Sequence, residues 1–290
     1  MFANEWNVLL VDDEPDVLSV SKLAMRNFTV YDVPLKLYTA ESKAEALELV
    51  DTSLMRQGGY LNLAVAFVDV VMETDSAGLE LCRYIREDLK DKFTVLYVRT
   101  GQPGVAPERT VIDRYDISGY FTKVEATEDK LYSLVKSGVR QYYSSGVSFA
   151  LSQMLHRLIV ASGSREQMAQ TMSGITSAHQ VDATGKKFEG ASYKNWMIAD
   201  GKVIAGGEGG DESEALELKA RLDQLPGTPL SEEGDKFAVD GSSVLIKIAE
   251  TSETAEFHEV MRTTFPPPDF IVFSFYRFLK SFATLWRQAS

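Results

Sequence analysis

The sequence predicts a mixed α/β protein in two parts. In the first half, continuous apolar runs alternate with segments of helical spacing, a pattern typical of a doubly wound parallel sheet covered on both faces. In the second half, two Asp-Gly pairs each join two β-rich runs, which indicates antiparallel hairpins within an α+β arrangement. A chain of 290 residues has room for two domains, and we expect them to cover residues 1–145 and 146–290.

The first half contains four short runs that we expect to be strands. Each of them ends beside a carboxylate, a hydroxyl or a lysine. The expected strands are residues 7–11, 63–68, 93–98 and 119–122. Helical spacing of apolar residues predicts helices over 41–50, 79–89 and 127–143, the last capped by Thr127.

The boundary between the halves is expected as a weak break at Ser144-Ser145-Gly146. After it, apolar spacing predicts helices over 147–161, 165–177 and 212–225. Asp200-Gly201 and Asp240-Gly241 are the expected hairpin turns. A run of three prolines precedes a last helix over 270–288, which is apolar over most of its circumference. We expect this helix either to pack on the sheet of its own domain or to dock a partner or a second copy.

Composition excludes several classes of protein. The chain has 42 acidic and 30 basic residues and a net charge of −12, so it lacks the basic surface that duplex nucleic acid requires. Its one cysteine cannot form an internal disulfide, and the first residues do not resemble a signal peptide. The most apolar stretch, 270–286, contains Arg277 and Lys280 and is not expected to span a membrane. We therefore expect a cytoplasmic protein that binds no nucleic acid.

Five side chains with the chemistry of phosphoryl transfer follow the expected strands. Asp12 and Asp13 follow the first strand, and Asp69 follows the second. Thr100 and Lys123 come at the ends of the other two. Because parallel sheets place ligands at the carboxyl ends of their strands, these groups can converge. Neighbouring carboxylates repel unless a divalent cation lies between them, so the arrangement predicts a Mg²⁺ site with Asp69 as nucleophile.

The motifs VLLVDDEPD, VAFVDVVM, VRTG and GYFTK occur in this order, and residues 1–140 resemble the receiver domain of two-component response regulators. The resemblance implies a flavodoxin-like (βα)5 fold and a phosphoryl group accepted by Asp69. It implies that Asp13, Asp69 and the backbone carbonyl of Val71 bind Mg²⁺, with Asp12 acting mostly through water.

The same resemblance assigns roles to residues around the acceptor. Thr100 and Lys123 match the residues that contact the phosphoryl group, and Tyr120 matches the aromatic switch residue. Val71 and Gln102 match the two variable positions that tune dephosphorylation. Val124 stands where the family has proline after the lysine.

The resemblance also implies partners. A histidine kinase or a phosphotransfer protein is the expected phosphoryl donor. The segment RTGQPGVAPE is similar to a subgroup that often precedes a GAF-like region and a cyclic-di-GMP phosphodiesterase domain. The second half therefore resembles a diverged GAF-like domain. Its hairpin–helix–hairpin–helix order agrees with that expectation.

Three hypotheses describe the output of the second half. Because it has no HD pair and no GYP motif, we expect no enzyme activity beyond phosphoryl transfer, and an output through a protein partner or a homodimer that uses the apolar last helix. The alternative is a GAF-like sensor of a small molecule or cyclic nucleotide, controlled by phosphorylation. The third, an enzyme acting on a nucleotide or phosphoester, has no residues that we can name.

Overall fold

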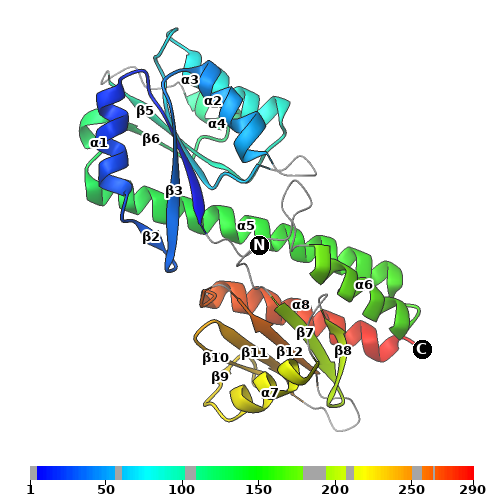
Figure 1. The fold of residues 1–290 in the computed structure, drawn as a ribbon. Helices are drawn as coiled ribbons and strands as arrows, with labels where there is room; N and C mark the ends of the chain where they lie inside the picture. Colours follow the sequence, from blue (N-terminus) through cyan, green and yellow to red (C-terminus); the bar gives the residue numbers. More distant parts are fainter. Residues whose placement is uncertain are drawn as a thin grey trace. The chain divides into compact units, whose positions relative to one another are not determined.

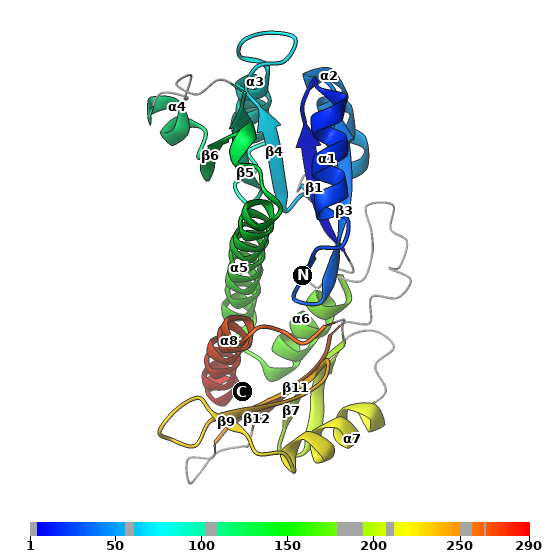
Figure 2. The same ribbon diagram turned by 90° about the vertical axis from the view of Figure 1, so that its left-hand side faces the viewer.

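The chain forms two compact units, each built around one six-stranded sheet (Figures 1 and 2). The computed structural model describes residues 5–55, 61–101, 109–178, 194–206, 212–249, 257–263 and 265–290. The described residues up to Ser145 form the first unit, and those from Gly146 onward form the second.

The sheet of the first unit is parallel except at one edge. Its strands are β1 (Trp6–Val11), β2 (Thr29–Val30), β3 (Val33–Ala40), β4 (Val65–Asp69), β5 (Val95–Thr100) and β6 (Gly119–Thr122). They lie in the order β2-β3-β1-β4-β5-β6, and only the short β2 is antiparallel to its neighbour. Without β2, the strands follow the order 2-1-3-4-5 along the chain, which is that of the flavodoxin-like fold. The predicted fold class of this half is confirmed.

Helices cover both faces of this sheet. They are α1 (Pro15–Met25), α2 (Lys43–Leu49), α3 (Ala77–Arg83), α4 (Arg109–Arg114) and α5 (Glu128–Ala161), with short turns η1 (Val50–Leu54), η2 (Tyr84–Asp88) and η3 (Lys123–Glu125). Helices α2 and α3 share one buried core with the strands, and Figure 1 shows α1 on the opposite side of the sheet. Helix α5 also packs closely, because a Cβ atom at Gly138 would lie 2.7 Å from Val65.

Helix α5 differs from the sequence prediction. Two helices were expected with a break at residues 144–146, but one helix runs through these positions. Tyr143, Val147 and Leu151 are buried at intervals of four residues, so the apolar stripe crosses Gly146 without a change of phase. A glycine inside a helix lowers helix stability by about 1 kcal/mol relative to alanine. This is too little to end a helix whose residues before and after the glycine are buried.

The sheet of the second unit is antiparallel. Its strands are β7 (Lys194–Ala199), β8 (Lys202–Gly206), β9 (Thr228–Pro229), β10 (Lys236–Asp240), β11 (Ser243–Ile248) and β12 (Phe257–Arg262), in the order β8-β7-β12-β11-β10-β9. Both predicted hairpins are confirmed. Asp200 and Gly201 form a two-residue turn with φ of 51° and 71°, the left-handed values that this turn requires.

Helices α6 (Arg165–Ala178), α7 (Glu212–Asp223) and α8 (Asp269–Gln288) complete the second unit. Helix α7 packs on one face of the sheet around Trp196 and Leu245. Helix α8 packs on β11 and β12, where the rings of Phe257 and Phe282 are in contact. The apolar face of α8 is thus largely buried on the sheet of its own unit, one of the two alternatives that the sequence left open. None of the described helices has the length and apolarity needed to cross a bilayer.

Candidate phosphoryl-transfer site

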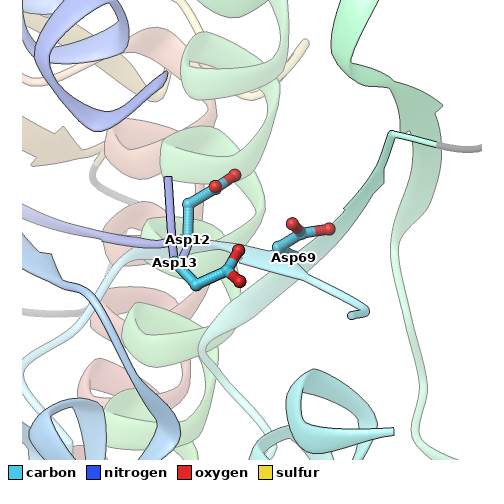
Figure 3. A group of neighbouring side chains, drawn as sticks. All are labelled: Asp12, Asp13 and Asp69. Carbon is cyan, nitrogen blue, oxygen red and sulfur yellow. The ribbon is translucent and has the colours of Figure 1, made fainter. Parts of the chain in front are cut away.

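Three carboxylates gather where β1 and β4 end. Asp12 and Asp13 directly follow β1, and Asp69 is the last residue of β4 (Figure 3). One carboxylate oxygen from each lies within 4.8 Å of the others. Asp12 and Asp69 are buried, whereas Asp13 is exposed to solvent. The parallel pairing of β1 with β4 brings these two strand ends together, as the sequence predicted.

Local backbone contacts hold the two loops in place. The carboxylate of Asp12 accepts a hydrogen bond from the backbone N–H of Glu14 at 3.0 Å, just before Pro15 starts α1. The Gly78 N–H donates to the carbonyl of Val70. Gly78 has to be glycine, because a Cβ atom there would overlap the backbone carbonyl of Asp69. The chain after Asp69 is therefore folded closely against the start of α3.

Lys123 connects the carboxylates from the other side. It follows β6, and its Nζ lies 2.7 Å from Asp69 Oδ2 and 3.1 Å from Asp12 Oδ1. Nζ also lies 2.6 Å from Glu14 on the rim. The turn that carries Lys123 is fixed by a capping box between Thr122 and Glu125.

The electrostatics of the pair follow from burial and hydrogen bonding. Burial raises the pKa of Asp69 above its ordinary value, and the hydrogen bond from Lys123 only partly opposes this. Burial lowers the pKa of Lys123, but its hydrogen bonds to Asp69, Glu14 and Asp12 outweigh that effect and raise the pKa. Lys123 therefore carries its positive charge at neutral pH, beside a carboxylate that is more basic than usual.

The donor set fits a magnesium ion. Mg²⁺ prefers oxygen ligands and keeps several waters, and three carboxylates, one of them exposed to solvent, supply such ligands. Asp69 Oδ1 is buried and accepts no hydrogen bond from any described residue, which leaves it available to a cation or a reacting phosphorus.

Three of the four remaining predicted site residues lie in or just after strands of the same sheet. Thr100 ends β5 and is buried. Tyr120, in β6, packs against the core of the first unit, and its hydroxyl is buried without a hydrogen-bond partner among the described residues. Val71 lies half-buried, two residues after Asp69. Gln102 lies outside the described residues.

The sequence analysis did not identify Arg99 as a residue of this site. This residue lies within β5, is 1% exposed, and pairs with Asp12 at 2.7 Å. The signal was present in the sequence, because a charge inside the apolar run VLYVRT must find a partner if the strand is buried.

Comparison with known proteins gives three kinds of result. No protein-family model matches the chain. The 3'3'-cGAMP-specific phosphodiesterase 2 of Vibrio cholerae serotype O1 (strain ATCC 39315 / El Tor Inaba N16961) is 42% identical over 137 residues, which are 47% of this chain and 25% of that protein. The chain thus spans about a quarter of the length of this relative.

Several receiver domains of known structure are similar to about half of this chain. A CheY-like receiver domain protein from Methanospirillum hungatei JF-1 matches 49% of this chain and 98% of its own, with 15% identity and a TM-score of 0.40. The receiver domain of an HD domain-containing protein from Pseudomonas fluorescens Pf-5 matches 48% of this chain and 98% of its own, with 17% identity and a TM-score of 0.40. The phosphorylated cyanobacterial phytochrome response regulator RcpA matches 49% and 96%, with 18% identity and a TM-score of 0.36. The chain is thus similar to receiver domains over about half of its length, which is the resemblance that its motifs predicted.

The expectation that this protein is not an enzyme is wrong. A relative that is 42% identical over 137 residues, 47% of this chain, is a phosphodiesterase. The expectation rested on the absence of an HD pair and a GYP motif, and these are not the only residues that can hydrolyse a phosphodiester.

Proposed function

We propose that this chain is a two-component response regulator that accepts a phosphoryl group on Asp69, with Mg²⁺ bound at the acidic cluster. One observation carries the proposal. The Asp69 carboxylate is held by Lys123 at Oδ2, while Oδ1 has no hydrogen-bond partner among the described residues and lies in a group with Asp12 and Asp13. A merely structural ion pair would not need the two further carboxylates beside it.

The chemistry follows from these positions. An Asp69 carboxylate oxygen attacks the phosphorus of a phosphohistidine on a kinase or phosphotransfer protein, forming an O–P bond as the P–N bond breaks. The electron pair goes to the imidazole nitrogen, which then takes a proton from solvent. The Lys123 ammonium and the Thr100 hydroxyl offer donors to the transferred oxygens.

Asp13, Asp69 and the Val71 carbonyl are the groups that we assign to the metal, with Asp12 acting through water. When bound, Mg²⁺ neutralises charge on the phosphoryl oxygens. Tyr120 is proposed as the residue that reports phosphorylation to the surface around β6, with Val71 and Gln102 tuning the lifetime of the phosphorylated state.

The acceptor assignment is tested by labelling the full chain with acetyl phosphate and Mg²⁺. We expect intact mass spectrometry to show one added phosphoryl group on the wild type, and none on Asp69→Asn. Asp75→Asn is the matched control, because Asp75 is exposed and lies only six positions after Asp69 in the chain. Equal labelling of wild type and Asp69→Asn would contradict the proposal.

For the output, the sequence favoured a protein partner or a second copy of the chain, and a GAF-like sensor stays a prediction. The Vibrio cholerae relative favours a different output. We propose that phosphorylation of Asp69 in the first unit controls hydrolysis of a cyclic dinucleotide. The phosphorylated and unphosphorylated chains from the labelling experiment can be assayed directly with 3'3'-cGAMP.

A further inference from the structure

Arg99 is a buried cation beneath the acidic cluster. Its Nη2 lies 2.7 Å from Asp12 Oδ2, and its Nη1 donates to the hydroxyl of Ser21 in α1 at 3.0 Å. The side chains of Arg99 and Asp12 are 1% and 0% exposed. A guanidinium in such a place is stable only because a fixed carboxylate neutralises it.

Hydrogen bonds within the protein occupy the carboxylate of Asp12. Arg99 binds Oδ2, while Lys123 Nζ and the Glu14 N–H both bind Oδ1. Both oxygens of Asp12 are therefore hydrogen-bonded. Asp69 differs, because its Oδ1 has no hydrogen-bond partner among the described residues. Asp13, the third carboxylate of the cluster, is exposed to solvent.

Arg99 also changes the charge of the site. Apart from Glu14 on the rim, Asp12, Asp13 and Asp69 contribute three negative charges, and Lys123 alone would leave these four groups with a net charge of −2. Arg99 reduces this to −1 from a position where solvent does not screen it. Less negative charge means weaker attraction for a divalent cation.

We propose that Arg99 is a positioning residue that keeps Asp12 as an internal counter-ion, weakens Mg²⁺ binding, and leaves Asp13 and Asp69 as the carboxylates that bind the metal directly. The proposal rests on the proposed function of the site. It predicts a rise in Mg²⁺ affinity on loss of Arg99 alone and little change on loss of the whole Arg99–Asp12 pair.

The first experiment measures Mg²⁺ binding to the full chain by isothermal titration calorimetry. Arg99→Met removes the cation and frees an oxygen of Asp12, so we expect Mg²⁺ affinity to rise by about tenfold. Arg99→Lys keeps the charge and should stay within about threefold of wild type. Weaker binding in Arg99→Met would overturn the proposal, because it would mean that Arg99 holds Asp12 in place as a ligand.

The second experiment uses the double variant Asp12→Asn/Arg99→Met, which removes both partners of the buried pair and so avoids an uncompensated charge. The net charge of the site is then unchanged, and we expect Mg²⁺ affinity within about threefold of wild type. A loss of about tenfold or more would show that Asp12 binds the metal itself, and would overturn the proposal. This variant decides the question if Arg99→Met does not fold.

Two controls separate the proposal from the function on which it rests. Arg83→Met removes an exposed arginine of the same unit and should leave Mg²⁺ affinity unchanged. Wild type that binds no Mg²⁺ would overturn both the proposed function and the role of Arg99. Wild type that binds Mg²⁺ and is labelled on Asp69, with variants that fail the expectations above, would overturn the role of Arg99 alone.

Discussion

Glu259 is a carboxylic acid buried in the sheet of the second unit. It lies in β12, is 0% exposed, and its Oε1 accepts a hydrogen bond from the side chain of Asn195 in the neighbouring β7. Its Oε2 has no hydrogen-bond partner among the described residues. Burial raises the pKa of Glu259 from an ordinary 4.5 to about 8, and the hydrogen bond from Asn195 opposes this only in part. We expect the second unit to lose stability when Glu259 ionises.

The sign and size of the effect follow from that pKa. Between about pH 4.5 and about pH 8, the folded chain holds a proton on Glu259 that the unfolded chain has lost, so stability falls as the pH rises. A pKa of about 8 against 4.5 corresponds to about 5 kcal/mol at full ionisation. Roughly 4 kcal/mol of this should be lost between about pH 5 and about pH 9.

Glu259→Gln tests this, because glutamine has the shape of the protonated acid and cannot ionise. The assay is urea unfolding followed by tryptophan fluorescence in a Trp6→Phe background, where Trp196 and Trp286 both report on the second unit. We expect Glu259→Gln to be more stable than its parent at about pH 9 by several kcal/mol and similar to it at about pH 5. Glu217→Gln is the control at an exposed site of the same unit. If parent and Glu259→Gln lose stability in parallel over this range, the reasoning is wrong.

Two further predictions concern stability. Asp235 is buried and accepts hydrogen bonds from the Ala249 N–H at 2.8 Å and the Tyr276 hydroxyl at 2.9 Å, so Asp235→Asn should cost roughly 2–4 kcal/mol in urea unfolding. Burial raises the pKa of Asp235, but these hydrogen bonds and the one from Lys280 lower the pKa overall. The stabilisation is therefore present above about pH 4 and is lost as the pH falls. An unchanged urea midpoint in Asp235→Asn would argue against this role. Gly146→Ala should stabilise the chain by about 0.5–1 kcal/mol, because a Cβ atom there meets nothing within 4 Å. A lower melting temperature in this variant would indicate that α5 is not a continuous helix at residue 146.

Much of the first unit was predictable because its central strands are buried on both faces. Asn7–Val11 and Leu63–Val68 are continuous apolar runs, and their ends carry the three carboxylates that the fold brings together. Helix α1 and strand β3 were not identified. Only Leu18, Ser21 and Met25 are buried in α1, and β3 contains Pro34 and Lys36, so neither shows a strong apolar pattern.

The buried ionisable residues were the harder part. Arg99 and Glu259 both lie in strands, and their partners Asp12 and Asn195 are 87 and 64 residues away along the chain. The spacing of residues within a strand shows that a charge faces the interior, but not which distant group meets it. Strand β12 was also not predicted. Its sequence FHEVMR contains three ionisable side chains in six residues, a composition typical of a surface segment.

Strand β9 affects how copies of this protein can associate. It is the outermost strand of the second sheet, only two residues long, and it ends in Pro229, which has no N–H to donate. An edge of this kind gives an incoming strand almost nothing to pair with, and so protects against sheet-to-sheet polymerisation on that side. Self-association by strand addition is therefore disfavoured at this edge.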